Sequence, residues 1–428
     1  MGPWPDVRPR CVWGGALQPH FGDRDGLLYH GDIRRGALGG MMTLFERFEV
    51  IDVDTHITEP ADTWTSRVSR RWGDAIPHVE RRDGEDVWVL NGQRWAKPGN
   101  TAMAGFDGTL PEGPATYDDM HPAAWNPTAR VAFMDEQKIR AQVLYPNIGG
   151  FGGGGWLDHG DPAFALECVQ AYNNFQIDFA SVAPDRLLPI ISLPFWDVEA
   201  SVVEIERCVG AGHRGINFCN QPEAFGQPNL WDQHWDPIWE AAKDTGVTVN
   251  FHIGGGRIGE QITTGLELGF RANFARISSL LFVDNLRCIS NLIHGGVCHR
   301  FPDVRFVSVE SGVGMIPGAL EAFDWQWRNG GVVREHPEYD LLPSEYFRRQ
   351  IYGCFWYERD SITSALLAYP DNMMFETDFP HPTCQHPGPQ TPAVEPAHYA
   401  ESALISLPDE VLRKVLVSTA AELYGVAV

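Results

Sequence analysis

The sequence predicts an α/β protein built as a single (β/α)8 barrel, a TIM barrel, with a β-hairpin insertion after its first strand. Two observations support this prediction. About eight short, mostly apolar segments rich in β-branched residues recur between residues 47 and 376, as expected for strands buried on both faces. Amphipathic helical patterns lie between several of them, and strand–helix alternation builds right-handed βαβ units around a parallel sheet. Eight such units close a barrel.

The predicted strands cover residues 49–53, 141–146, 187–193, 214–219, 247–251, 304–309, 350–355 and 372–376. Helix signals separate them. Asp161 stands at an N-cap position with Pro162 at the first helical position, and a second amphipathic pattern begins at Asp197. An open doubly wound sheet is the alternative, but such a sheet needs a glycine-rich turn after its first strand. The segment IDVDTHITEP (51–60) contains no glycine, which favours the barrel.

Residues 1–44 differ from the remainder of the chain. They are rich in Gly, Pro and Arg and show no periodicity, so we expect a loosely ordered extension, or translation that begins at Met41 or Met42. The barrel then occupies residues 45–428, with an insertion at about 60–135. Within it, HVERRDGEDVWVLNGQRWAKP contains two turn signals, RDGED and NG, and predicts a hairpin that serves as a cap or a dimer contact.

A glycine-rich segment, GGFGGGGW (149–156), follows the second predicted strand. It is a candidate mobile lid. It resembles a phosphate-binding loop only weakly, because no Lys followed by Ser or Thr completes the pattern.

Composition narrows the classes of partner. The net charge is −23, from 33 basic and 56 acidic residues, so nucleic acid and anionic membrane are not expected partners and a small-molecule substrate is. The eight cysteines are scattered without metal-binding spacing, which predicts free thiols in a reducing cytoplasm. We expect neither a membrane span nor a secretory signal, because no apolar run is long enough and the N-terminus lacks a compact apolar region.

Polar residues stand where several predicted strands end. Asp54 and His56 close the first strand with the same side-chain parity, His252 follows the fifth, Glu310 the sixth and Asp378 the eighth. In a (β/α)8 barrel these positions share one rim, where active sites are built. Two imidazoles and three carboxylates at one rim predict a site for zinc or for a harder divalent cation.

The segments DVDTHITEP, VNFHIGGG, RFPDVRFVSVESGVGMIP and FETDFPHP, in this order, resemble the amidohydrolase superfamily. Within it they are similar to the amidohydrolase-related (amidohydrolase 2) branch, which contains aminocarboxymuconate-semialdehyde decarboxylase and γ-resorcylate decarboxylase. The resemblance covers about residues 47–428. It implies one divalent metal, usually zinc or manganese, held by Asp54, His56, His252 and Asp378. Together with the hairpin insertion, it also implies a homodimer.

Two positions depart from the pattern of this branch. The first-strand motif, commonly H-x-H or E-x-H, is here Asp54-x-His56. The sixth-strand histidine of the known decarboxylases is replaced by Glu310, a carboxylate that can ligate a metal or carry a proton. This replacement favours a hydrolase acting on a small organic acid, amide or ester through metal-activated water, with Asp378 as general base and Glu310 assisting. A non-oxidative decarboxylase of an aromatic or unsaturated acid is the first alternative. A two-metal oxygenase and a non-catalytic structural paralogue are the others.

The cofactor and the substrate contacts follow from this hypothesis. Zinc is the expected ion, with manganese or iron as alternatives, and one ion is expected unless Glu310 bridges to a second. Tyr145, Trp356 and Trp325 are candidates for an aromatic substrate pocket, and His381 contacts either the substrate or its own loop. Two further carboxylates, Glu59 and Glu376, are expected to support ligands rather than to bind the metal.

Overall fold

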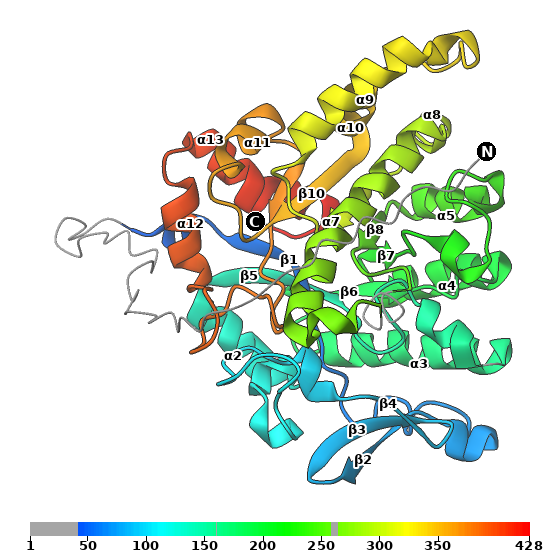
Figure 1. Ribbon diagram of the computed structural model, residues 1–428, viewed down its shortest axis with the longest axis vertical. Helices are drawn as coiled ribbons and strands as arrows, with labels where there is room; N and C mark the ends of the chain where they lie inside the picture. Colours follow the sequence, from blue (N-terminus) through cyan, green and yellow to red (C-terminus); the bar gives the residue numbers. More distant parts are fainter. Residues whose placement is uncertain (1–41, 160, 258–263) are drawn as a thin grey trace, which may run out of the picture. The chain divides into compact units, whose positions relative to one another are not determined.

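The computed structural model describes residues 42–159, 161–257 and 264–428, so the predicted extension at residues 1–44 falls almost wholly outside the described part. One parallel sheet of eight strands forms the centre of the described chain (Figure 1). In spatial order its strands are β1 (Val50–His56), β5 (Ile139–Tyr145), β6 (Leu187–Ser192), β7 (Gly215–Asn217), β8 (Thr248–His252), β9 (Phe306–Val309), β10 (Ile351–Phe355) and β11 (Met373–Phe375). All eight predicted strands are present.

The last strand returns to the first. Just beyond the end of β11, Phe379 forms a parallel bridge with Thr55, and the His56 amide donates to the Phe379 carbonyl at 2.8 Å. The Asp378 amide donates to the Asp54 carbonyl at 3.0 Å. These bonds nearly close the sheet into a barrel, which confirms the predicted fold class.

Helices connect the strands and cover the outside of the sheet. The longer ones are α2 (Pro127–Gln137), α3 (Pro162–Ala180), α4 (Val198–Ala211), α5 (Asp236–Thr245), α7 (Phe270–His294), α9 (Ile316–Gly330), α10 (Pro343–Gln350), α11 (Ile362–Ala368) and α12 (Pro396–Leu404). Shorter helices are α1 (Leu44–Arg47), α8 (Val297–Arg300), α13 (Asp409–Arg413) and α14 (Thr419–Tyr424). The predicted N-caps are confirmed, because Asp161 accepts a bond from the Ala163 amide and Asp197 one from the Ala200 amide. No helix in the described ranges combines the length and apolar character that crossing a bilayer requires.

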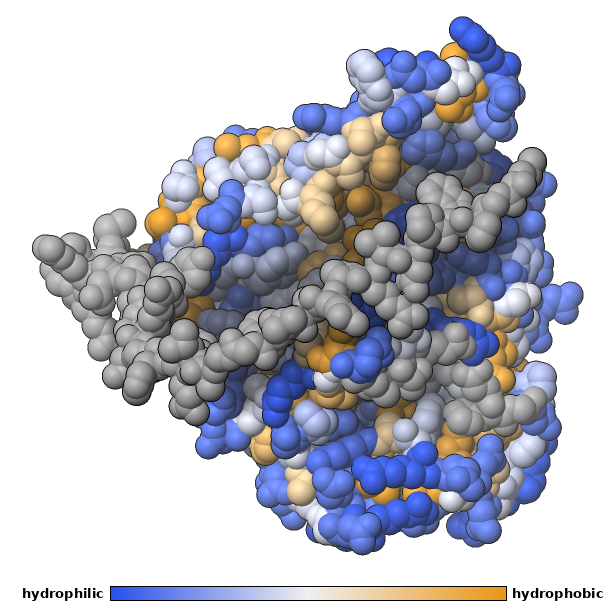
Figure 2. All heavy atoms as spheres, in the orientation of Figure 1, coloured by the Kyte–Doolittle hydropathy of each residue, from blue (hydrophilic) through white to orange (hydrophobic). Residues whose placement is uncertain are grey.

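The predicted hairpin insertion is a three-stranded antiparallel sheet between β1 and β5. Its strands are β2 (His78–Arg82), β3 (Glu85–Leu90) and β4 (Gln93–Ala96). Trp88 of β3 is fully buried, and its ring packs edge-on against Trp64 at a centroid distance of 5.1 Å. Hydrophilic residues gather on the visible surface over these strands (Figure 2). Trp88 and Leu90 of β3 belong to the large cluster that also contains Trp64, so these side chains pack the insertion against the barrel.

Buried side chains form two clusters, one inside the barrel and one between the strands and the helices around them. An inner cluster inside the barrel contains Ile51, Val53 and Val309 together with Tyr424 of the C-terminal helix α14. A larger outer cluster fills the space between strands and helices. The β1–β5 pairing shifts register between Asp52 and Thr55, so the alternation of side chains is broken just before the end of β1.

A buried arginine fixes the end of β1 from the outer layer. The guanidinium of Arg130, on α2, donates to the His56 carbonyl at 2.6 Å, the Ala123 carbonyl at 2.6 Å and the side chains of Thr55 and Gln142, each at 3.2 Å. Burial lowers its pKa to about 9. It also lies 4.8 Å from the centroid of the Phe379 ring, on the far side of the barrel seam. Arg130 thus links α2, β1 and the segment after β11.

We expect Arg130→Met to destabilise the fold by about 3–5 kcal/mol, because it leaves the buried His56 and Ala123 carbonyls without their donor. Urea denaturation followed by circular dichroism would measure the change. The exposed Arg328 on α9 provides the control, since Arg328→Met should change the free energy of unfolding by less than about 0.5 kcal/mol. Equal stability of the two variants would contradict the role given to Arg130.

Candidate metal-binding active site

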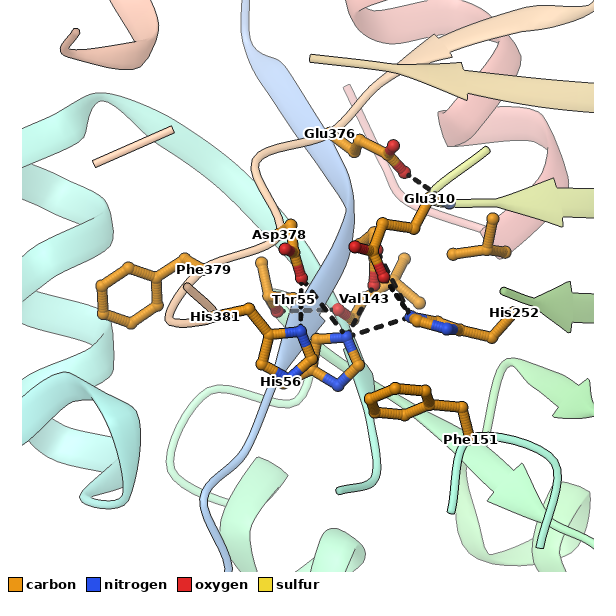
Figure 3. A network of polar contacts seen from close by, with 12 residues as sticks. Thr55, His56, Val143, Phe151, His252, Glu310, Glu376, Asp378, Phe379 and His381 are labelled. Carbon is orange, nitrogen blue, oxygen red and sulfur yellow. Dashed lines mark hydrogen bonds and ion pairs between the residues drawn. The ribbon is translucent and has the colours of Figure 1, made fainter. Parts of the chain in front are cut away.

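The five side chains predicted at the strand ends converge at one rim of the barrel. Figure 3 shows four of them, those of His56, His252, Glu310 and Asp378, directed toward one another. The Nε2 atoms of His56 and His252 lie 3.0 Å apart. Asp54 reaches both imidazoles, at 3.5 Å from His56 Nε2 and 3.6 Å from His252 Nε2. Asp378 lies 3.6 Å from His56 Nε2, and Glu310 lies 3.4 Å from His252 Nε2. Residues more than 300 positions apart therefore surround one small volume.

Unusual backbone conformations turn two of these carboxylates into the barrel. Val309 belongs to the inner cluster, so regular alternation would point the next residue outward. Glu310 instead has φ of 53° and Asp378 has φ of 58°, both in the left-handed region that non-glycine residues seldom adopt. Such strain, which is higher for Glu than for Asp, concentrates at functional sites. The register shift in β1 has the same effect on Asp54, which follows the inner-cluster residue Val53.

Both imidazoles present a lone pair to the shared volume. Nδ1 of His56 faces the Pro146 carbonyl at 3.1 Å, and Nδ1 of His252 faces the Ile253 carbonyl at 2.8 Å. A carbonyl only accepts hydrogen bonds, so each Nδ1 carries a proton, and a neutral ring leaves its Nε2 unprotonated. Two Nε2 lone pairs 3.0 Å apart repel each other unless a proton or a metal cation lies between them. Within the described chain, neither carboxylate oxygen of the buried Asp54 accepts a hydrogen bond. This donor set fits a divalent cation.

The site carries a surplus of buried negative charge. Burial, reinforced by the neighbouring Asp378, raises the pKa of Glu310 well above its usual value. Burial together with Asp54 likewise raises the pKa of Asp378 and of Glu376. Carboxylates crowded in a low-dielectric interior disfavour each other's ionisation, and a bound cation removes that penalty.

Two sets of four residues meet the distance requirement for a metal. Asp54, His56, His252 and Glu310 form one set, and His56, Glu310, Asp378 and His381 form the other, with the donor atoms of each set within 4.8 Å of one another. Because the sets share His56 and Glu310, they surround the same volume, which suits one ion better than two.

His381 lies beside the ligand set and not on the surface of its loop. Its Nδ1 is 2.7 Å from Asp378 Oδ1, and its ring stacks on that of His56 with centroids 3.6 Å apart. Its Nε2 contacts the side-chain oxygen of Asn147 at 2.7 Å. Glu59, as expected for a supporting residue, accepts bonds from the Asn147 and Ile148 amides at 2.9 and 3.0 Å. Sequence reasoning missed Asn147, although it stands two residues after β5 and the strand-end rule would have included it.

Of the other predicted residues, three lie close to the ligand cluster and one lies on the surface. Glu376 was expected to accept hydrogen bonds or to orient a ligating histidine, and its Oε2 accepts a bond from the Glu310 amide at 3.3 Å. Tyr145 is fully buried, with its ring centroid 5.4 Å from that of His252. Trp356 is buried and donates to the Thr383 carbonyl, and Thr383 in turn donates to Asp378 at 3.1 Å. Trp325 lies on α9 with 66% of its surface exposed, so its prediction as a pocket residue was wrong.

The glycine-rich segment covers the ligand set. The ring of Phe151 lies against both imidazoles, with centroids 4.6 Å from His252 and 5.3 Å from His56. Sequence reasoning singled out the glycines and missed this aromatic residue. The glycines allow close packing, because a Cβ atom at Gly149 would lie 2.2 Å from Nε1 of Trp156. Residues 149–152, 154 and 155 of the segment line a cavity of about 440 Å³.

Imidazoles and carboxylates buried together at the rim of a parallel barrel define a metal-dependent barrel enzyme. Comparison with known families is consistent with this class. A family model described as amidohydrolase matches residues 51–426, and the chain belongs to this family.

Individual relatives are more distant. Over 271 residues the chain is 25% identical to 2-amino-3-carboxymuconate-6-semialdehyde decarboxylase of Dictyostelium discoideum, covering 60% of this chain and 67% of the relative. A solved amidohydrolase of Mycobacterium avium subsp. paratuberculosis has a TM-score of 0.69 at 21% identity, covering 88% of this chain and 99% of that one. A 5-carboxyvanillate decarboxylase of Novosphingobium aromaticivorans, solved with manganese and 4-hydroxy-3-methoxy-5-nitrobenzoic acid, has a TM-score of 0.61 at 17% identity, covering 88% of this chain and 96% of that one.

Glu59 should make stability depend on pH. Burial raises its pKa from the ordinary 4.5 to about 7, so the folded chain holds a proton that the unfolded chain releases. Its contribution to stability is therefore complete below about pH 4.5 and is lost as the pH rises to about 7. Glu59→Gln removes this loss, and its amide oxygen can still accept from Asn147 and Ile148. We expect the variant to gain a few kcal/mol relative to wild type between pH 5 and pH 8, by denaturant titration. A constant difference across this range would contradict the assignment.

Proposed function

We propose that this chain is a metal-dependent, non-oxidative decarboxylase of an aromatic or unsaturated acid. The observation that carries the proposal is the similarity to two named decarboxylases, which favours this alternative over the hydrolase that Glu310 had suggested from the sequence. Glu310 is compatible with decarboxylation, because a carboxyl group at the metal-ligand cluster can supply a proton to carbon.

The proposed ligands of one divalent ion are Asp54, His56 and His252, which belong to one of the two sets, and Asp378, which belongs to the other and shares His56 with the first. Three carboxylates near two imidazoles suit manganese at least as well as zinc, and the manganese in the similar 5-carboxyvanillate decarboxylase supports manganese over the zinc expected from the sequence. When bound, such an ion holds substrate oxygens and stabilises the negative charge that develops as carbon dioxide leaves.

Glu310 is the proposed proton carrier. Its side chain is 10% exposed, whereas the side chains of Asp54, His56, His252 and Asp378 are fully buried, so it is the member of the cluster that a substrate can reach. As the bond to the carboxyl group breaks, its electron pair stays on the substrate carbon. The Glu310 proton then bonds to that carbon, and Glu310 regains a proton from solvent.

Neighbouring groups hold these residues in place. Glu376 accepts from the Glu310 amide and so fixes the strained backbone beneath the proton carrier. Thr383 and His381 contact the two oxygens of Asp378 and set the orientation of this proposed ligand. The Phe151 ring excludes water from the imidazoles on one side.

The ligand assignment predicts that Asp378→Asn lowers the affinity for Mn²⁺ by at least about tenfold, because an amide oxygen carries no charge. Elemental analysis of anaerobically purified protein and titration of the metal-free chain with Mn²⁺ would measure this. His299→Ala on α8 is the matched control and should bind about one equivalent with wild-type affinity, since His299 is remote from the cluster. Wild-type metal content and affinity in Asp378→Asn would show that the assignment is wrong.

The reaction itself predicts isotope patterns. A panel of aromatic and unsaturated acids, tested with Mn²⁺-loaded protein in D₂O, should include one that releases carbon dioxide and gains one deuterium at the carbon that lost it. Glu310→Gln should lower kcat by about 10²–10⁴-fold with metal content preserved, whereas the exposed Glu335→Gln should have no effect.

Other isotope outcomes would contradict decarboxylation. Incorporation of ¹⁸O from water without release of carbon dioxide would identify a hydrolase. Oxygen consumption by protein holding about two iron ions would identify a two-metal oxygenase. Failure of the loaded chain to act on the panel would support a non-catalytic paralogue.

A further inference from the structure

The proposed ligands are closed off from solvent. The side chains of Asp54, His56, His252 and Asp378 are fully buried, and that of Glu310 is 10% exposed. An ion and a substrate must nevertheless reach these groups. The side chains that cover the cluster therefore decide how the site is entered.

One aromatic ring covers the imidazoles. The ring centroid of Phe151 lies 4.6 Å from that of His252, 5.3 Å from that of His56 and 5.5 Å from that of His381. Figure 3 shows this ring on one side of the His56 and His252 imidazoles and the labelled carboxyl groups of the cluster on the other. Phe151 itself is partly exposed, whereas the three histidines are buried. The ring thus covers one side of the imidazoles.

A cavity of about 440 Å³ meets the cluster at this residue. Phe151 lines the cavity, as does Asn147, whose side-chain oxygen contacts His381 at 2.7 Å. None of the described residues that line it is a proposed metal ligand, and Glu310 is not among them either. Phe151 therefore belongs to the cavity wall and also contacts the cluster, so it stands between the two.

Contacts from two directions fix Phe151. Asn217, at the end of β7, donates a hydrogen bond from its side chain to the Phe151 carbonyl. Trp156, the last residue of the glycine-rich segment, packs edge-on against Trp64 and Trp95, with ring centroids 5.5 and 5.2 Å away. Because Trp95 belongs to β4, the insertion anchors the segment that carries Phe151.

The glycine-rich segment is a closely packed wall. A Cβ atom at Gly152 would lie 2.9 Å from the Gly255 carbonyl oxygen, and one at Gly155 would lie 2.8 Å from a carbonyl oxygen of the segment itself. Only glycine fits at such distances. The sequence GGFGGGGW carries two side chains, Phe151 and Trp156, and Trp156 packs against the insertion. Phe151 is therefore the side chain that the segment presents to the cluster.

We infer that Phe151 is the access-determining residue of this site: its ring separates the imidazoles from the cavity and slows the passage of ions and small solutes between them. The inference rests on the proposed function, whose ligand cluster it concerns, and extends it to the way the site is entered. Because the ring ligates nothing, it should slow metal binding and metal release alike and leave the affinity almost unchanged. A residue that only supports the ligands would change the affinity instead.

The first measurement is the rate of metal release. Full-length protein loaded with Mn²⁺ is mixed with excess EDTA, and free Mn²⁺ is followed by electron paramagnetic resonance. Phe151→Ala should release the ion at least about tenfold faster than wild type, with a Kd for Mn²⁺ within about threefold of the wild-type value. Phe151→Leu, which keeps part of the side-chain volume, should lie between the two.

The second measurement needs neither metal nor turnover. Metal-free protein is treated with diethylpyrocarbonate, and modification of His56 and His252 is located by peptide mass spectrometry. Relative to the exposed His336 in the same sample, both should react at least about tenfold faster in Phe151→Ala than in wild type.

Phe225→Ala is the matched control for both measurements. The Phe225 ring packs on the same segment, since a Cβ atom at Gly154 would lie 2.2 Å from its Cζ atom. Among the described ring contacts, none joins Phe225 to an imidazole of the cluster. This variant should release Mn²⁺ and react with diethylpyrocarbonate as wild type does.

Unchanged rates in Phe151→Ala, or an equal rise in Phe225→Ala, would overturn the inference. A Kd weakened in proportion to faster release would also overturn it, because the ring would then support the ligands and not block passage. If Phe151→Ala does not fold, Phe151→Leu carries the same test. Faster labelling in a chain that binds no Mn²⁺ would overturn only the ligand assignment. Faster release from a chain that decarboxylates none of the acid panel would overturn only the proposed function.

Discussion

The structure depends on a cluster of buried carboxyl groups, whose ionised forms need a counter-charge. Asp54, Asp378, Glu310 and Glu376 share one interior volume with two imidazoles whose lone pairs face each other. A cation at this point would link β1, β8 and the segment after β11, and with Glu310 also the end of β9. The seam between β1 and Asp378 is made of only a few backbone bonds. Metal binding by the proposed ligands would therefore be coupled to closure of the barrel, because Asp54, His56 and Asp378 also form the backbone bonds of the seam.

Polar groups outside the ligand cluster determine how its members point. Arg130 binds the carbonyl of His56 from the outer layer, and Asp52 binds the amide and hydroxyl of Thr377, the residue before Asp378. Glu59 holds Asn147, which contacts His381. These contacts come from different elements and hold residues on both sides of the seam, on β1 and on the segment after β11. They restrict the positions of His56 and Asp378 before any ion binds, which is the pre-organisation that precise chemistry requires.

Apolar runs were enough to place all eight strands, and the rule that parallel strands present their ends at one rim was enough to bring Asp54, His252 and Asp378 together. That rule does not predict local backbone conformation, such as a register shift or a positive φ. A register shift re-aims Asp54, and a positive φ re-aims Glu310, whose sequence neighbour Val309 points into the same interior. Phe151 lay within a segment interpreted only for its glycines. Trp325 was misplaced because aromatic content alone does not distinguish a pocket from an exposed helix face.

A carboxyl at residue 310 has consequences that a histidine would not have. A neutral imidazole leaves the charge of the site unchanged, whereas each ionised carboxylate adds repulsion against an acidic substrate. The site can accept such a substrate only if Glu310 is protonated when the substrate arrives or if cations offset the added charge. A protonated carboxyl is the form that can donate to carbon. The requirement for binding and the requirement for catalysis thus select the same protonation state, and the burial of Glu310 beside Asp378, which raises the Glu310 pKa, favours that neutral form.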